Sequence, residues 1–117
     1  MKARIKHNKK IIEIKDIIEC KGFQKIKGMM FKKAENANAL LFKFKKPNKS
    51  PIHSFFCPIF LAIWLREKEM VEFKIIKSFT LRIKPKKDFD MLLEIPWNKK
   101  YCNIIKDFYD DKINENI

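Results

Sequence analysis

Lys27-Gly28-Met29-Met30-Phe31-Lys32 separates a predicted helix, which ends at Gly28, from a predicted β-strand further along the chain. Before it, apolar side chains recur at helical spacing, so we predict a short helix over residues 20–27 that ends at Gly28, where a C-cap glycine belongs. After it, a polar loop over residues 33–38 leads to residues 40–45. There Leu40, Phe42 and Phe44 alternate with other side chains, a period-two pattern that predicts a β-strand.

The same alternation continues along the chain. We expect further strands at residues 11–15, 52–57, 59–65, 71–76, 79–84 and 91–95, a turn at 46–51 and a charged hairpin tip at 66–69. Asn98 is placed to cap a second short helix over residues 98–106, and residues 110–117 are expected to fray. The predicted fold is mainly β, an antiparallel β-sandwich or barrel-like domain with two short helices, or α+β in a looser classification.

Aromatic residues of the predicted strands are expected to fill the core. They are Phe42, Phe44, Phe55 and Trp64. At 117 residues and 14.1 kDa the chain should form one domain over residues 1–117, and it should bury roughly two-thirds of its unfolded surface. No apolar run reaches the roughly 20 residues of a membrane helix, so membrane insertion is not expected.

The cysteine and glycine content limits the cofactors and the catalytic groups that can be predicted for this chain. Cys20, Cys57 and Cys102 form no paired framework, which favours a reducing, cytoplasmic location. Only two glycines occur, so no glycine-rich phosphate loop is present and no cofactor is predicted. His53 and Cys57 share a face of their predicted strand; they could bind zinc together with Cys20 or Cys102, or form a nucleophilic pair. We prefer the simpler interpretation of a buried thiol and a rim histidine.

Charge suggests a polyanionic partner. The chain carries 27 Lys and Arg residues against 14 Asp and Glu residues, a net charge of +13. Only three of the basic residues are arginine, however, and Lys, Ile, Asn and Phe all have AT-rich codons. Part of the charge could therefore be compositional. If it is functional, the predicted nucleic-acid surface contains Lys43, Lys45, Lys46 and Lys49.

Four blocks, taken in order, resemble a prokaryotic family known only as DUF 192, or UPF 0127, in a short, archaeal-like form. They are Gly-Met-Met-Phe-Lys at residues 28–32, Leu-Leu-Phe-Lys-Phe at 40–44, His-Ser-Phe-Phe-Cys at 53–57 and Leu-Glu-Ile-Pro at 93–96. The resemblance implies a β-sandwich or barrel-like fold and no defined activity. An aspartate of bacterial members aligns with Leu61, and their polar insert has no counterpart, so chemistry carried by either would be lost.

The leading functional hypothesis is a small non-enzymatic binding or accessory module with an unidentified ligand or partner. Its ligand site is predicted at the loop after Gly28 and the strand at 52–57, with Lys27, Phe31, Lys32, His53 and Phe56 as the binding residues. A basic nucleic-acid-associated protein is the first alternative, and a hydrolase of unknown substrate is the second. No residue is assigned a catalytic or metal-binding role.

Overall fold

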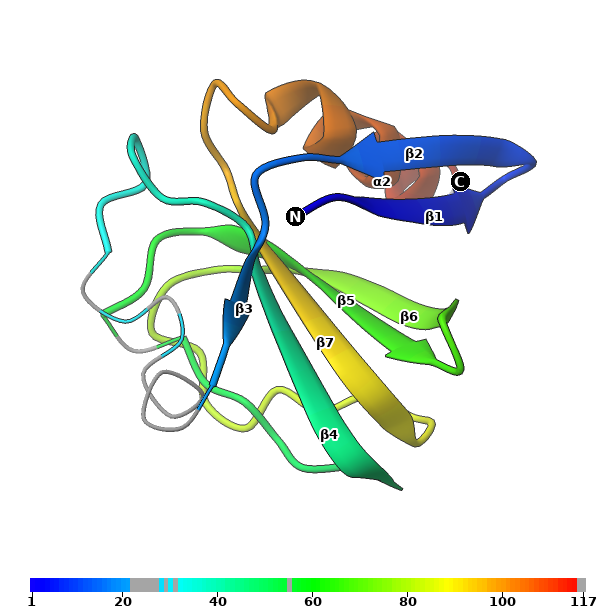
Figure 1. Cartoon of the computed structure of the whole chain (residues 1–117). Helices are drawn as coiled ribbons and strands as arrows, with labels where there is room; N and C mark the ends of the chain where they lie inside the picture. The colour runs from blue at the N-terminus through cyan, green and yellow to red at the C-terminus, as the bar shows by residue number, and fades with distance from the viewer. Residues whose placement is uncertain (22–27, 29, 31, 55, 116–117) are drawn as a thin grey trace.

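The computed structural model describes residues 1–21, 28, 30, 32–54 and 56–115, with side chains described up to residue 110. The strands are β1 (Ala3–His7), β2 (Lys10–Ile14), β3 (Ile18–Cys20), β4 (Leu40–Asn48), β5 (Phe60–Arg66), β6 (Glu69–Ile76) and β7 (Phe89–Pro96), followed by helix α2 (Cys102–Glu115). β1 and β2 form a hairpin, and the other strands form one sheet in the order β3-β4-β7-β5-β6 (Figure 1). Among the described strands, only β3 and β4 pair in parallel. The fold is mainly β, as predicted, and its sheets are open, not closed into a barrel.

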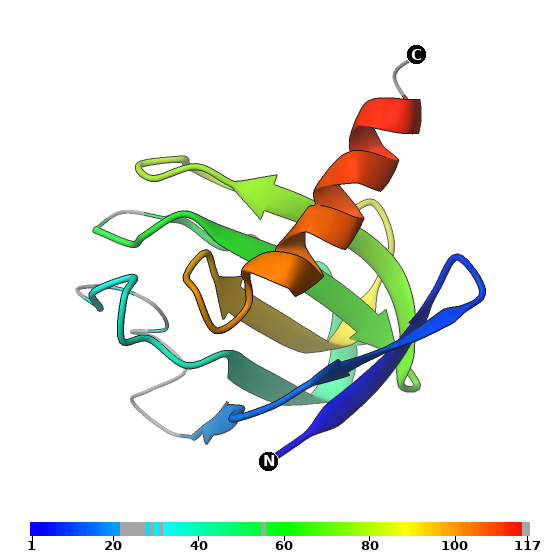
Figure 2. The same cartoon turned by 90° about the horizontal axis from the view of Figure 1, so that it is seen from above.

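Alternation along the inner strands divides the interior into two cores. On β5, Leu61, Ile63 and Leu65 face one side, and the intervening Phe60, Ala62 and Trp64 face the other. The first side is covered by the β1–β2 hairpin and by α2, which lies across the sheet (Figure 2). The second side packs against loop residues, including Ala37, Cys57 and Ile83. We call these the helix-side core and the loop-side core.

Strand predictions succeed where a strand has a ladder partner. β5 and β6 pair around a tight turn at Glu67 and Lys68, at the predicted hairpin tip, and β7 lies between β4 and β5. β4 runs on to Asn48, into the predicted turn. Phe42 and Trp64 are buried as expected, whereas Phe44 is only partly buried and Phe55 lies outside the described residues.

Two predicted strands are wrong. Within the described part of residues 52–57 and 79–84, one isolated bridge, between Ile52 and Ile83, stands in place of the two predicted strands. Phe79 and Arg82 have φ values of 61° and 47°, and this left-handed backbone interrupts any ladder. The alternating side chains consequently do not share one buried face: Phe79 is 63% exposed, while Ile83 is buried.

Helix predictions are tested only at the C-terminal end. Cys20 ends strand β3, and residues 22–27 of the first predicted helix lie outside the described part of the chain. The second predicted helix is present as α2 and continues through Glu115, well past residue 106 and into the tail expected to fray. Its inner face buries Ile105 and Phe108, which belong to the helix-side core together with Tyr101, the residue just before the helix.

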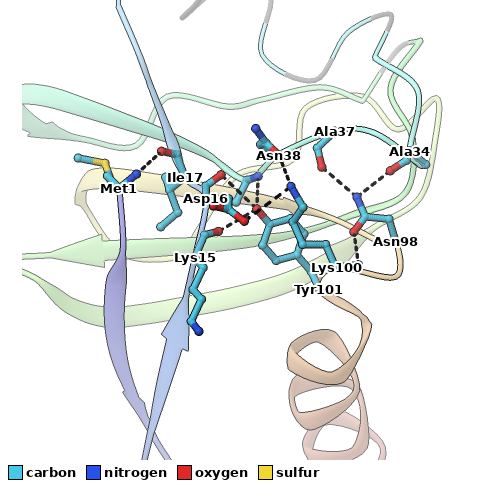
Figure 3. Close-up of polar contacts among 11 residues, drawn as sticks. Met1, Lys15, Asp16, Ile17, Ala34, Ala37, Asn38, Asn98, Lys100 and Tyr101 are labelled. Carbon is cyan, nitrogen blue, oxygen red and sulfur yellow. Dashed lines mark hydrogen bonds and ion pairs between the residues drawn. The ribbon is translucent and has the colours of Figure 1, made fainter.

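A buried tyrosine ties the helix to two loops that precede strands of the sheet (Figure 3). The Tyr101 hydroxyl accepts a hydrogen bond from the Ala39 amide at 3.0 Å and donates toward the carbonyl oxygens of Lys15 and Asp16, at 2.9 and 3.2 Å. Beside it, the Asn98 side-chain amide donates to the carbonyl oxygens of Ala34 and Ala37 at 2.7 and 2.9 Å. We call the contacts of the Tyr101 hydroxyl the Tyr101 latch.

Tyr101→Phe is expected to lower the free energy of unfolding by about 1–3 kcal/mol, because it leaves the buried Ala39 amide without its acceptor. Tyr109→Phe is the matched control, since Tyr109 is 43% exposed on the same helix and should change stability by less than about 0.5 kcal/mol. Urea unfolding of both variants measures the difference. Equal effects would show that the latch does not stabilise the fold.

Candidate binding site

The structure describes three of the five residues predicted to bind a ligand. Lys32 and His53 are exposed, and Phe56 is 57% exposed, whereas Lys27 and Phe31 lie outside the described residues. His53 and Phe56 lie on the loop between β4 and β5, not on the predicted strand. The arrangement of this loop depends on a residue between them, Ser54, which the sequence pattern does not single out.

Ser54 is fully buried and holds two loops together. Its hydroxyl donates to the carbonyl oxygen of Lys77 at 2.5 Å and accepts from the Thr80 amide at 2.7 Å. Its own amide donates to the Thr80 carbonyl at 3.0 Å, and its carbonyl accepts from the amides of Cys57 and Phe79, each at 3.1 Å. Ser54 therefore joins its own loop to residues 77–80 with backbone-directed hydrogen bonds that a strand ladder would otherwise supply.

The two joined loops present aromatic rings at the surface. Phe56 and Phe79 lie edge to face with ring centroids 5.9 Å apart, and both are more than half exposed. Both also have positive φ, 55° and 61°, an unusual conformation for a bulky residue. Nearby in the sequence, Leu81 is 64% exposed. Strained backbone and adjacent exposed apolar side chains are both features that occur at binding surfaces.

Thr80, the residue after Phe79, lines a basic groove of about 460 Å³ whose lining includes neither ring. Its floor is formed by the end of β6 and by residues 80–84, and its cationic side chains are Lys74, Lys77, Arg82 and Lys84. Lys74 is fixed in place, because its ammonium donates to the Lys84 carbonyl at 3.1 Å and lies 3.6 Å from Glu72. Lys77, Arg82 and Lys84 make no ion pair within the part of the chain that the structure describes. Their charge is available to an anion.

The lysines predicted to bind nucleic acid occupy a different place. Lys43, Lys45 and Lys46 are exposed on β4, and Lys49 follows that strand. Lys43 is already engaged, with its ammonium 3.1 Å from a carboxylate oxygen of Glu19. Hydrogen bonding by Lys43 is the main cause that lowers the pKa of the Glu19 carboxyl below its ordinary value.

A buried carboxylate lies in the loop-side core. Glu94 is only 6% exposed on the central strand β7, where it pairs in register with Leu40 and Ala62. Gly28, with φ of 52°, approaches it so closely that an added Cβ would lie 3.3 Å from a Glu94 carboxylate oxygen. An acidic side chain is ordinarily expected to meet water, so Glu94 is not among the predicted core residues. The sequence nevertheless contains an indication that Glu94 is buried. Glu94 lies on the same strand face as Leu92, and the residues of this strand are apolar on both faces.

The thiols near this carboxylate are kept protonated. Burial, reinforced by the negative charge of Glu94, raises the pKa of the Cys20 and Cys57 thiols from 9.0 to about 11. A nucleophilic or metal-binding cysteine requires the opposite shift, toward the thiolate. Among the described residues, no three His, Cys, Asp or Glu side chains gather closely enough to hold a metal ion. Cys57 thus behaves as the buried thiol of the simpler interpretation.

Comparisons with known proteins agree with the fold class. No known family model matches the chain, and no curated protein matches its sequence. A solved structure, that of a protein of unknown function from Novosphingobium aromaticivorans DSM 12444, superposes with a TM-score of 0.66 over 87% of this chain and 76% of the other. The two share 11% sequence identity, so the likeness establishes a common fold. No helix in the described residues is long and apolar enough to span a membrane.

The raised thiol pKa values predict a loss of stability in alkali. Below pH 9 both folded and unfolded thiols are protonated, so stability is unaffected. Between pH 9 and about 11 the unfolded thiols ionise while the folded ones do not, and the free energy of unfolding falls, by at most about 1.4 kcal/mol per pH unit for each thiol. Cys57→Ala should therefore flatten the decline of stability with pH, measured by urea unfolding. Cys102→Ala, at a less buried position, should leave the slope unchanged; identical slopes in all three proteins would contradict the assignment.

Proposed function

We propose that this protein is a non-enzymatic binding module for a polyanionic ligand. The ligand would dock on the surface formed by the Phe56–Phe79 ring pair and the basic groove, which we call the aromatic-basic platform. One observation carries the proposal: Ser54 joins the two loops that carry the exposed rings, and the loop of Phe79 also lines a groove with three cations that have no ion pair among the described residues. A rigid surface of this kind binds without the entropic cost of ordering its loops.

Single-stranded nucleic acid is the polyanion that best matches both halves of the platform. Exposed rings can stack on bases, and each stacked base contributes about 1–3 kcal/mol. Cations in the adjoining groove can neutralise phosphates, which gives affinity without sequence preference. A base-free polyanion such as heparin would use only the groove. The rings therefore distinguish the two ligands.

Catalysis is not part of the proposal. The described thiols that adjoin Glu94 are held in the unreactive protonated form, and Glu94 itself is enclosed in the loop-side core. We retain membership of the DUF 192 family as a proposal, supported by the four sequence blocks and by the mainly β architecture that the resemblance implies. A cytoplasmic location is likewise proposed, because the described Cys20, Cys57 and Cys102 form no disulfide.

Fluorescence anisotropy with a labelled oligothymidine, at two or more salt concentrations, tests the platform. The triple variant Lys77→Glu, Arg82→Glu, Lys84→Glu should weaken binding and reduce the slope of log affinity against log salt by about 2, since each phosphate contact on a single strand contributes about 0.7. Phe56→Ala with Phe79→Ala should weaken oligothymidine binding while leaving heparin binding nearly unchanged. Ser54→Ala should weaken binding without altering the charge.

A charge-matched control separates the platform from a diffuse basic surface. Lys43→Glu, Lys45→Glu, Lys46→Glu makes the same type of charge change on β4, away from the groove lining. If this variant loses as much affinity as the groove variant, binding follows net charge and the platform is not the site. If the β4 variant alone loses affinity, the surface predicted from sequence is the correct one.

A further inference from the structure

A second recess lies on the opposite side of the large sheet from the loop-side core. It opens between the first residues of the chain and β4, β5 and β7, and its volume is about 260 Å³. Its apolar wall is formed by side chains of the helix-side core, namely Ile5, Leu41, Leu65, Met91 and Leu93. We call it the hairpin crevice.

The crevice exists because the hairpin packs on the sheet without joining it. β1 pairs only with β2 among the described strands, so no strand ladder joins it to the sheet and its side chains pack on the sheet face. The start of the chain is nevertheless anchored: the Met1 amino group donates to the Ile17 carbonyl at 3.0 Å, and the Ile17 amide donates to the Met1 carbonyl at 2.9 Å (Figure 3). This anchor lets one wall of the crevice hold its position.

Cationic side chains line the crevice around the apolar wall. They are Lys2, Arg4, Lys43 and Lys68. Arg4 and Lys43 are positioned by Glu13 and Glu19, at 3.4 and 3.1 Å, and neither carboxylate lines the crevice. Lys2 and Lys68 form no ion pair with any residue that the structure describes. The described lining is thus apolar and cationic, with no acidic residue in it.

We infer that the hairpin crevice binds a single-chain amphiphile with an anionic head, such as a medium-chain fatty acid. An apolar chain would lie against Leu41, Leu65 and Leu93, and the head would meet the lysine ammonium groups at the water-facing side, where long cationic side chains place their charge. The volume is slightly below the about 300–1,000 Å³ of sites for drug-sized molecules, which suits one short chain. Charge complementarity excludes a cationic amphiphile.

Titration of the full chain with octanoate, monitored by nuclear magnetic resonance shifts of backbone amides, tests this site. Octanoate should shift amides of β1 and of β4, β5 and β7, and octanol, which has the same chain without the charge, should bind more weakly. Lys2→Glu with Lys68→Glu should weaken octanoate binding about tenfold. Met91→Trp, which fills the crevice without altering its charge, should abolish the shifts of both ligands.

Two controls establish whether octanoate binds in the crevice itself. Lys77→Glu with Lys84→Glu makes an equal charge change in the basic groove and should leave octanoate binding unchanged, so this inference and the proposed function can fail separately. Vesicles of phosphatidylcholine with phosphatidylglycerol test whether a membrane surface is the real ligand. Equal weakening in both double variants, shifts outside the crevice, or binding to vesicles without binding to octanoate would each overturn the inference.

Discussion

A sheet that is apolar on both faces has to be covered on both faces, and this constraint shapes the whole molecule. The inner strands β5 and β7 bury nearly every side chain, so neither face can meet water. One face receives the hairpin and α2, joined to the sheet through the hydroxyl of Tyr101. The other receives loops, which must satisfy their own backbone groups; Ser54 does this for two of them. A buried hydroxyl therefore forms hydrogen bonds on each side of the sheet, that of Tyr101 on the helix side and that of Ser54 on the loop side.

Sequence periodicity predicts β2, β4, β5, β6, β7 and the C-terminal helix, but not β1, β3 or the contacts that hold the covers on the sheet. Three predicted strands become neighbours in the sheet, so their alternating side chains are enough to identify them. They are residues 59–65, 71–76 and 91–95. Residues 79–84 alternate equally well, yet no described strand offers them a ladder, because the backbone of Phe79 and Thr80 bonds to Ser54 and that of Ile83 bonds only to Ile52. The contacts of Tyr101 with Lys15 and Asp16 span 86 and 85 residues, and no local pattern reveals a hydroxyl that serves such distant carbonyls.

The candidate sites can be predicted only in part from the sequence, because they too depend on contacts between residues that are far apart in the chain. Phe56 is among the residues predicted to bind a ligand, but the pattern places its ring partner Phe79 in a half-buried strand. The cations beside that pair, Lys77, Arg82 and Lys84, are less conspicuous than the denser lysines of β4, since clustering in sequence is the available criterion. Glu94 is a residue whose burial the sequence does predict. It lies within a strand that is apolar on both faces, so its side chain is buried whichever face it occupies.

The position of the basic groove has a consequence for how this protein behaves at high concentration. β6 is an edge strand of the large sheet, and an edge strand can pair with the same strand of a second molecule. In a parallel pairing, Lys74 of one molecule would lie opposite Lys74 of the other, and these like charges would repel. A bound polyanion would neutralise this repulsion. Binding of the ligand would then also remove the charge repulsion that opposes self-association of the protein.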